Sequence, residues 1–277
     1  MRNTIGSLAG SIVLITGAAM GMGKMYAHLA VRDNAAHVVL WDINGQLLEE
    51  AADELRGRGS LIHSHVVDVS SLEDIEAAAG KVRNDVGTPD ILINNAGIVR
   101  GKYFWDHDQR SDIAATMAIN TLAPMHITRE FLPAMIEGGR TSRIVNVASA
   151  AGLLANPRMS IYSSSKWAVV GWSDSLRLEL VQAGHHHIKV TTFCPSYINT
   201  GMFEGARGPL LTPLLEPAAV TERVWAAMKA GTPMLMMPWT VKLSTALRGI
   251  LPIAVWDVVA GRMFGVYKSM DNFTGRK

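Results

Sequence analysis

Short apolar runs rich in β-branched residues recur along the chain as far as residue 194, and longer segments with helical character separate them. Strands that alternate with helices are typical of a parallel sheet, because each connection between parallel strands must cross one face of the sheet. The runs are Ser11–Thr16, His37–Trp41, Leu61–Val67, Ile91–Asn94, Ile144–Val147 and Val190–Cys194. This alternation predicts an α/β fold, a doubly wound parallel sheet of the Rossmann type with helices on both faces.

Two sequence signals mark helix starts between these runs. Ser70 followed by Glu73 has the spacing of a capping box, which predicts a helix from Ser71 to about Val86. Asn44 is a second candidate N-cap. We therefore expect the helices after the second and third strands to begin close to these residues.

Composition and charge exclude several classes of protein. Of the 277 residues, 48% are hydrophobic and 18% are charged, which is typical of one globular domain with a large core. The net charge of +2, without dense basic blocks, argues against nucleic acid as a partner. Cys194 is the single cysteine, so no internal disulfide is possible. Without a signal peptide at Met1–Gly10 or an apolar run of about 18–20 residues, we expect a cytoplasmic protein.

A glycine-rich turn follows the first predicted strand. Gly17, Gly21 and Gly23 fall in the segment Thr16–Gly23, ahead of a helix expected to begin near Lys24. Glycines there permit a tight turn and let a pyrophosphate approach the backbone N–H groups and the positive end of the helix dipole. An ordinary glycine-containing loop is the alternative. The segment predicts a dinucleotide phosphate site, with Met22 at its centre.

An acidic residue ends the second predicted strand. Asp42 lies 19 positions after Gly23, where a carboxylate can bond the ribose hydroxyls of NAD and repel the extra phosphate of NADP. We therefore expect NAD rather than NADP. The alternative is that Asp42 only begins the turn Asp42–Gly45, since aspartate favours turns.

A tyrosine and a lysine four positions apart are the candidate chemical centre. On a helix beginning near Ser160, Tyr162 and Lys166 share one face, and a nearby cation lowers the pKa of a phenol. Such a pair also arises by chance, so it needs support. Ser149 follows the fifth predicted strand and reaches the sheet edge at which ligands bind. Asn120, in the middle helix, completes the candidate set.

These motifs, in this order and spacing, resemble the short-chain dehydrogenase/reductase family over about residues 8–203. The motifs are Thr16–Gly23, Asp68-Val69, Asn94–Gly97, Asn120, Ser149 and Tyr162-x3-Lys166. The resemblance implies that Tyr162 is the acid/base and that Ser149 donates to the substrate oxygen. It also implies that Lys166 lowers the tyrosine pKa and binds the nicotinamide ribose, and that Asn120 holds a water in the proton relay.

The cofactor contacts are implied by the same resemblance. Asp68 and Val69 would line the adenine, and Asn95, Ala96 and Gly97 would support the cofactor and the central sheet. Ile198 and Thr200 would contact the carboxamide, in a loop where Ser196 replaces the glycine of many members. The segments Cys194–Phe203 and Met270–Lys277 resemble the retinol and 17β-hydroxysteroid dehydrogenase branch. Residues 204–277 would then form a substrate lid and an apolar extension.

The lid and the extension are rich in large apolar side chains, which suggests a bulky lipophilic alcohol or ketone as substrate. Packing against the core or a partner subunit is an equal alternative. These side chains are Leu210, Leu211, Leu214, Leu215, Trp239, Leu251 and Trp256, and Trp225–Met228 and Met234–Met237 belong to the same lipophilic texture. Contact of Trp239–Tyr267 with a membrane surface is a further possibility, aided by Lys242, Arg248, Arg262 and Lys268.

The resulting hypothesis is an NAD-dependent oxidoreductase that interconverts an alcohol and its carbonyl by hydride transfer. An NADP-dependent carbonyl reductase and a non-catalytic dinucleotide sensor are the alternatives. The family resemblance also implies a homodimer or homotetramer formed through Asp108–Ile136 and Ser160–Gly184. We expect no metal site, because the adjacent histidines of His185–His187 do not converge easily on one ion.

Overall fold

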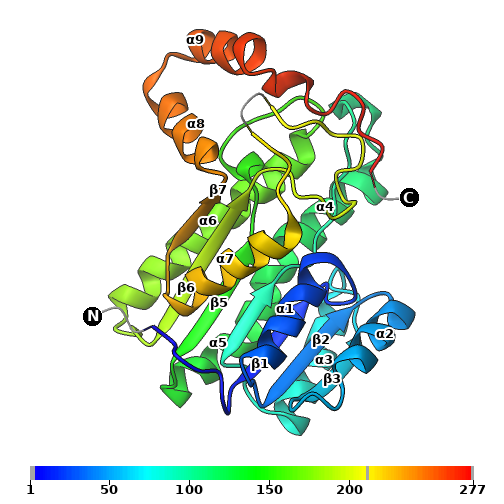
Figure 1. Ribbon diagram of the computed structural model, residues 1–277, viewed down its shortest axis with the longest axis vertical. Helices are drawn as coiled ribbons and strands as arrows, with labels where there is room; N and C mark the ends of the chain where they lie inside the picture. The colour runs from blue at the N-terminus through cyan, green and yellow to red at the C-terminus, as the bar shows by residue number, and fades with distance from the viewer. Residues whose placement is uncertain (1–3, 210–211, 276–277) are drawn as a thin grey trace.

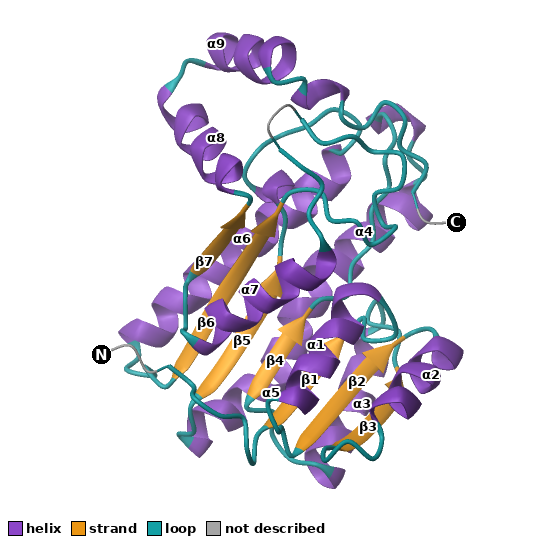
Figure 2. Ribbon diagram, in the orientation of Figure 1, coloured by secondary structure: helices purple, strands orange, loops and turns teal. Residues whose placement is uncertain are grey.

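Seven parallel strands form one sheet in the order β3-β2-β1-β4-β5-β6-β7 (Figure 2). The computed structural model describes residues 4–209 and 212–275. The strands are β1 Ile12–Thr16, β2 His37–Asp42, β3 Leu61–Val66, β4 Ile91–Asn94, β5 Ser142–Val147, β6 Ile188–Pro195 and β7 Met234–Met237. The first six match the predicted runs, and the doubly wound parallel sheet is confirmed. The strand order reverses between β1 and β4.

Helices cover both faces of this sheet. One face carries α1 Gly21–Arg32, α2 Gly45–Leu55 and α7 Pro217–Lys229, and the other carries α3 Leu72–Asp85, α5 Ala123–Gly138 and α6 Ser160–Gln182. A short α4, Ala115–Met117, lies between the π-helical segments Gln109–Ala114 and Ala118–Leu122. Beyond the sheet, α8 Trp239–Ile250 and α9 Ile253–Asp257 follow β7 (Figure 1).

The alternation of side chains along the strands divides the core into two layers. In β1, Val13 and Ile15 pack against α1 and α7, whereas Leu14 packs toward α3 and α5. Successive strand residues point to opposite faces, and in β1 both faces are buried, so Ile12–Ile15 are all apolar. Burying each such side chain stabilises the fold by about 1.5–3 kcal/mol, which fixes the sheet edge on which the site is built.

The helix-start predictions were right for one helix and off by one residue for the other. Asn44 caps α2, because its Oδ1 accepts from the backbone N–H of Leu47 at 3.1 Å. The cap of α3 is Ser71 rather than Ser70, with Oγ accepting from the N–H of Asp74 at 3.1 Å. Ser70 instead donates its N–H and hydroxyl to Asp68 Oδ1, at 2.9 and 2.7 Å.

Part of the predicted lipophilic surface is core. Met234–Met237 is the edge strand β7, paired in parallel with β6 from Thr192↔Met234 to Pro195↔Met237. Trp225 and Met228 are buried on the inner face of α7. The prediction of a pocket wall was therefore wrong for these segments, because methionine-rich runs fill a core as readily as they line a surface.

The C-terminal region lies over the carboxyl ends of the strands. Figure 1 shows α8 and α9 projecting beyond the sheet, while the last residues return toward the segment that contains α4. Within the described ranges 4–209 and 212–275, no helix combines the length and the hydropathy needed to cross a membrane. The C-terminal helices and loops thus lie beyond the carboxyl ends of β6 and β7.

Candidate active site

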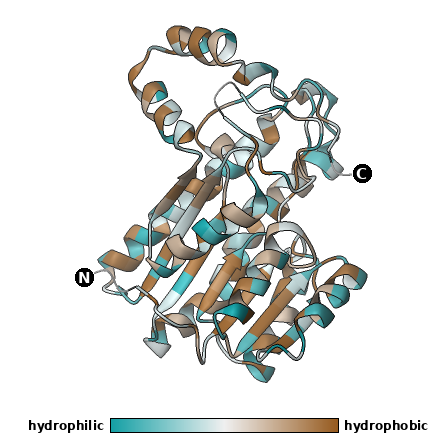
Figure 3. Ribbon diagram, viewed as in Figure 1, coloured by the Kyte–Doolittle hydropathy of each residue, from teal (hydrophilic) through white to brown (hydrophobic). Residues whose placement is uncertain are grey.

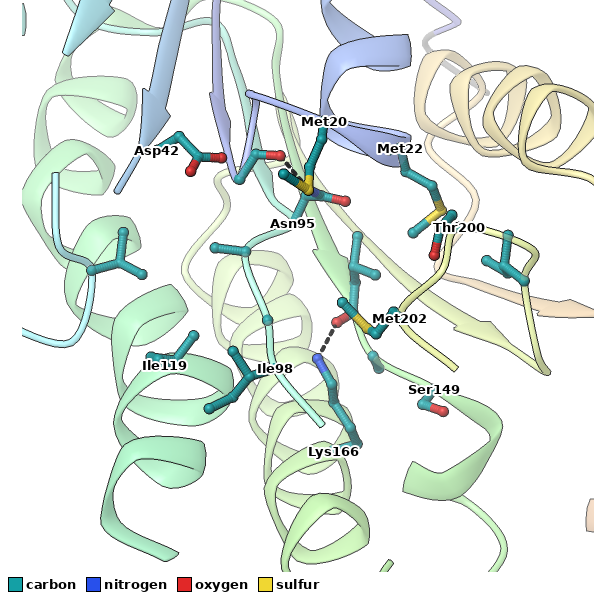
Figure 4. A pocket seen from close by; sticks show the side chains of 18 of the residues that line it. Met20, Met22, Asp42, Asn95, Ile98, Ile119, Ser149, Lys166, Thr200 and Met202 are labelled. Atoms are coloured by element: carbon teal, nitrogen blue, oxygen red, sulfur yellow. Dashed lines mark hydrogen bonds between the residues drawn. The ribbon is translucent and has the colours of Figure 1, made fainter. Parts of the chain in front are cut away.

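A cavity of about 370 Å³ opens at the carboxyl ends of the strands, where the strand order reverses (Figure 4). Ligands of open α/β sheets bind at this position. The predicted residues that line it are Gly17, Gly21, Met22, Asp42, Asp68, Val69, Asn95, Ala96, Gly97, Ser149, Tyr162, Lys166, Ile198 and Thr200. Gly23 and Asn120 were predicted as well, but they are not among its lining residues. The structure thus brings together most of the predicted site.

The glycine turn needs each of its three glycines for a different reason. Gly17 and Gly21 have φ of +65° and +56°, in the left-handed region that favours glycine. A Cβ on Gly23 would lie 2.0 Å from the carbonyl oxygen of Gly17. Gly23 therefore permits close packing of α1 on the turn instead of lining the cavity. The helix begins at Gly21, not near Lys24 as predicted.

Hydrogen bonds join this turn to the end of β4. Thr16 Oγ1 accepts from the backbone N–H groups of Asn95 and Ala96, each at 3.0 Å. Asn95 Nδ2 donates to the carbonyl oxygens of Thr16 at 2.9 Å and Gly17 at 3.2 Å. These bonds fix the end of β1 against the end of β4, and the Asn95 side chain holds the glycine turn in place.

Asp42 begins the turn to α2, as one interpretation of the sequence held, and it also contacts the glycine turn. Its Oδ2 accepts from the backbone N–H of Ala19 at 3.0 Å, and its Oδ1 accepts from that of Asn44 at 3.0 Å. The first bond holds the carboxylate against the glycine turn, and the second opens the loop to α2. The result is a fixed negative charge at the edge of the cavity.

The residues present fit a nicotinamide dinucleotide. The first turn of α1 contains no acidic side chain, so the positive end of its dipole faces the cavity unopposed. Gly17 and Gly21 line the cavity and have no side chains, so their backbone is open to a pyrophosphate. Asp42 lies toward one end of the cavity lining, and Ser149 and Lys166 lie toward the other (Figure 4).

Tyr162 and Lys166 lie on α6, buried side by side at the base of the cavity. Lys166 Nζ donates to the carbonyl oxygen of Val147 at 2.9 Å and lies 5.8 Å from the centre of the Tyr162 ring. Burial raises the pKa of Tyr162 to about 12, and a hydrogen bond with Ser149 opposes that rise. Burial also lowers the pKa of Lys166 to about 8.

This pKa pattern differs from the one predicted. We expected Lys166 to lower the pKa of the phenol, but in this structure the loss of solvation outweighs any attraction between them. The Lys166 ammonium group donates to the Val147 carbonyl and lies away from the centre of the Tyr162 ring. The phenol oxygen of Tyr162 is hydrogen-bonded to Ser149 instead. The phenol is therefore neutral at physiological pH in the structure as described.

Asn120 acts on the backbone beside the cavity. Its Oδ1 accepts from the N–H of Ile98 at 2.8 Å, and its Nδ2 donates to the Ile98 carbonyl at 2.9 Å and to Ser165 Oγ at 3.1 Å. Both amide protons are committed to the protein, so only the amide oxygen remains to hold the water that the resemblance implied. Asn120 thus joins the loop after β4 to α6.

A second cavity of about 160 Å³ adjoins the first and shares Ser149, Pro195, Ser196 and Phe203 with it. Large apolar side chains from the C-terminal helices form its outer wall. They are Trp239, Leu243, Leu247, Trp256 and Phe264. Ser149 therefore lies between a glycine-lined cavity and a second cavity whose outer wall is apolar.

Only part of the predicted lid lines this apolar cavity. Trp239 and Trp256 do, as expected, whereas Leu251 does not. Leu214 is exposed, and Leu215 packs on the sheet core and pairs with the loop at Ile198. Leu210 and Leu211 lie outside the described residues. Ser196, the departure from glycine in that loop, donates its N–H to the Met237 carbonyl at 2.7 Å and so continues the β6–β7 pairing.

The C-terminal tail contributes side chains beside the cavities that no sequence motif indicated. The Ser269 hydroxyl lies 2.8 Å from both Tyr197 Oη and Asn156 Nδ2. Beside it, Met270 is buried in a cluster with Tyr162. Phe203 also packs edge-on to the Tyr162 ring at 5.8 Å between centroids. No spacing rule connects residues so far apart in sequence, so only the fold could reveal them.

Two other chemistries have little support at this site. Among the side chains that the structure describes, no group of three or more His, Cys, Asp or Glu residues is arranged to hold a metal ion. Cys194 is buried, and that burial raises the pKa of its thiol to about 12. A neutral thiol is a poor nucleophile.

Comparison with known proteins agrees with this geometry. Residues 11–209 match the family described as short chain dehydrogenase. Estradiol 17-beta-dehydrogenase 11 of Homo sapiens is 39% identical over 246 residues, 89% of this chain and 81% of that protein. Epidermal retinol dehydrogenase 2 of Homo sapiens is 35% identical over 274 residues, 98% of this chain and 87% of that protein.

Solved structures give the same result. A short chain dehydrogenase/reductase from Burkholderia phymatum in complex with NAD aligns with a TM-score of 0.80 and 26% identity, covering 88% of this chain and 94% of its own. A metagenomic short-chain oxidoreductase in complex with NADP aligns with a TM-score of 0.70 and 28% identity, covering 83% of this chain and 96% of its own. Both are complexes with nicotinamide dinucleotides.

Proposed function

Because this chain belongs to the short-chain dehydrogenase family, as its motifs predicted, we propose that it interconverts a bulky lipophilic alcohol and its carbonyl with NAD. The observation that carries this proposal is the position of Ser149 and Tyr162. Ser149 lines both cavities, and Tyr162 lies at the base of the cofactor-sized one. We assign residues 8–203 to cofactor binding and catalysis, and residues 204–277 to the substrate lid and extension.

The reaction requires the substrate oxygen to lie between two hydroxyls. Ser149 would donate to this oxygen, and Tyr162 would exchange a proton with it. Bound nicotinamide would accept or supply the hydride. With a pKa of about 12, Tyr162 keeps its proton at neutral pH and is ready to donate it during carbonyl reduction. Alcohol oxidation needs the phenolate, so its rate should rise with pH.

Lys166 and Asn120 would position the reacting groups. Lys166 would bind the nicotinamide ribose from its anchor on the Val147 carbonyl. Asn120 would hold the loop at Ile98 and a water of the proton relay. Glycine-turn N–H groups would bind the pyrophosphate, and Asp68 and Val69 would line the adenine.

NAD is proposed over NADP because of the charge on Asp42. Two backbone N–H groups hold this carboxylate at the cavity edge, where it would repel a ribose phosphate. The wild type should therefore show a higher kcat/KM with NAD than with NADP. In Asp42→Asn, which keeps an acceptor oxygen for Ala19, that preference should fall about tenfold. An unchanged ratio would assign the preference to other residues.

The substrate class follows from the apolar cavity. Its outer wall contains two tryptophans and two leucines from the C-terminal helices, so most of the surface that a ligand would meet there is apolar. The names of the relatives, an estradiol dehydrogenase and a retinol dehydrogenase, point to the same chemistry. We propose a steroid, retinoid or long-chain alcohol.

The test is nicotinamide reduction by the purified protein with NAD and a panel of such alcohols. Tyr162→Phe should lower kcat by about 10²–10⁴ through loss of acid/base catalysis, while cofactor affinity stays within about twofold. Substantial activity in Tyr162→Phe would refute the assignment. Cofactor binding without turnover of any alcohol or carbonyl would favour the alternative, a non-catalytic sensor.

One observation favours a second function in the same class. The neutral state of Tyr162 suits a reductase, so an NADP-dependent carbonyl reductase remains the alternative. It predicts faster turnover of a ketone with NADPH than of the matching alcohol with NAD.

We also propose a homodimer or homotetramer, formed through the segments 108–136 and 160–184. Exposed Trp167, Leu178 and Val181 on α6 and Leu122 before α5 support this assembly. Light scattering on the purified protein would measure it.

We place the protein in the cytoplasm, where the free thiol of Cys194 would stay reduced, with membrane contact through the C-terminal helices.

A further inference from the structure

Exposed apolar side chains on α8 form a single stripe. Trp239, Leu243, Ala246 and Ile250 are all exposed, and their spacing of four, three and four residues places them on one face of the helix. The opposite side of α8 is buried or faces the apolar cavity, through Val241 and other residues. The helix is therefore apolar on two sides, and one of them is not covered by any of the residues that the structure describes, 4–209 and 212–275.

The exposure continues along α9. Ile250 and Ile253 are 79% and 74% exposed on either side of the turn between the helices, and Val255 and Val258 are also exposed. Figure 3 shows apolar colour along both projecting helices, which lie at the end of the molecule farthest from β3. Large exposed apolar patches usually mark an interaction surface. We call this surface, α8 and α9 with Val258, the outer face.

The outer face meets the mouth of the apolar cavity. Trp239 and Leu243 line that cavity, yet they are 69% and 47% exposed. The same two residues begin the stripe on α8. A ligand that leaves the cavity between them would therefore emerge onto the outer face, not into open water.

Charge indicates what covers this face. The outer face has two basic residues, Lys242 and Arg248, and one acid, and the Arg248 guanidinium lies over the Trp167 ring of α6. Arg262 and Lys268 follow the face in sequence, so residues 239–268 together have a net charge of +3. The acid, Asp257, accepts a hydrogen bond from the Tyr267 hydroxyl. Exposed Lys242 lies beside the stripe, where a long basic side chain can reach anionic headgroups while its stem stays among apolar groups.

We propose that the outer face docks on an anionic phospholipid bilayer and that the substrate enters the apolar cavity from the bilayer, between Trp239 and Leu243. A second copy of the chain is a poorer occupant, because a twofold interface would bring the same basic residues toward one another. An exposed tryptophan at the rim suits a membrane interface, where its ring is apolar and its N–H is polar. The exposed apolar side chains and the basic residues of the outer face support the docking. The route of entry also rests on the proposed function, in which the apolar cavity holds the substrate.

The test is flotation with vesicles of about 70% phosphatidylcholine and 30% phosphatidylglycerol. The wild type should float with them and bind less to pure phosphatidylcholine or at high salt, which screens the basic residues. In the double variant Ile250→Ser/Ile253→Ser, binding should fall at least about tenfold, since two exposed apolar anchors are lost. The matched control is Leu61→Ser, at an equally apolar exposed position on β3, and it should float like the wild type.

Three results would overturn the docking proposal. They are a wild type that never floats, a double variant that floats as well as the wild type, and a double variant that changes from dimer to monomer in light scattering. For the route of entry, the double variant should lose about tenfold in turnover of an alcohol dissolved in the vesicles and keep turnover of a short water-soluble alcohol. Equal turnover in both would overturn it. Flotation needs no turnover, so a protein that floats without activity would refute the proposed function alone.

Discussion

The cofactor-sized cavity and the apolar cavity share Ser149 but are built by different means. The first is made of strand ends, small residues and backbone groups tied by hydrogen bonds, such as those from Asn95 to the glycine turn. The second is made of large side chains on α8, α9 and the tail, outside the sheet. In the proposed function, the region held by backbone hydrogen bonds would bind the cofactor, and the region held by side-chain packing would select the substrate.

The difference has a physical cause. Backbone N–H groups can bind a phosphate only if nothing stands before them, so the first cavity depends on glycine and on main-chain geometry. An apolar ligand needs only volume and apolar surface, which many side chains can supply. Substitutions in the first region should therefore change cofactor affinity, and substitutions in the second should change substrate affinity alone.

The largest effect is expected in the glycine turn. In Gly23→Ala, the new Cβ would lie 2.0 Å from the carbonyl oxygen of Gly17, so α1 must move away from the turn. We expect NAD affinity to fall by at least about tenfold and stability by about 1–3 kcal/mol, measured by fluorescence titration and denaturant unfolding.

The control for that variant is Gly80→Ala. Gly80 is helical, in α3, and a Cβ there meets nothing within 4 Å. It should stabilise the protein by about 0.5–1 kcal/mol and leave NAD affinity unchanged. If Gly23→Ala behaved like Gly80→Ala, the close packing of helix on turn would not be what shapes the phosphate site.

A smaller and more selective effect is expected in the apolar cavity. Leu247→Ala removes part of its wall, so KM for a lipophilic alcohol should rise about tenfold, with kcat and NAD affinity unchanged. Leu72→Ala, at an exposed position on α3, is the control and should change none of these. A loss of NAD affinity in Leu247→Ala would mean that the two cavities are not independent.

The smallest effect concerns the buried charge of Lys166. Its pKa is lowered from 10.5 to about 8, so between these values the unfolded chain binds a proton that the folded protein does not, and stability from this group rises with pH. Below pH 8 the buried ammonium destabilises the fold. Lys166→Met should therefore be about 1–2 kcal/mol more stable than wild type at pH 7, after allowance for the lost bond to Val147.

That advantage should disappear as pH rises toward 10. Denaturant unfolding at several pH values measures it, with Lys81→Met, at an exposed position, as a control that shows no such trend. A constant difference between wild type and Lys166→Met across this range would show that Lys166 is not buried as a charge.

The sequence predicted the region held by backbone hydrogen bonds far better than the other. Six strands and the α2 cap were predicted from periodicity and capping signals, and 14 of the 16 site residues predicted from glycine spacing and the family motifs line the cofactor-sized cavity. These features are local, or they follow from the rule that parallel strands end at one edge. The relatives also agree with the predicted retinol and 17β-hydroxysteroid branch.

The remainder depends on tertiary contacts that no local pattern encodes. Met234–Met237 has no alternation or β-branched residue to mark a strand, and only pairing with β6 makes it one. The contact of Ser269 with Asn156 and Tyr197 joins distant segments. The direction of the Tyr162 pKa shift was mispredicted because burial, which the sequence does not give, outweighs the nearby cation.

We propose that hydride passes directly between a ligand in the apolar cavity and a cofactor in the glycine-lined cavity. Mass spectrometry of the reduced cofactor formed from NAD and an alcohol that carries deuterium on its carbinol carbon tests this transfer. We expect NADH to contain the deuterium with the wild type and almost no NADH to form with Tyr162→Phe. Unlabelled NADH, or equal formation by Tyr162→Phe, would contradict it.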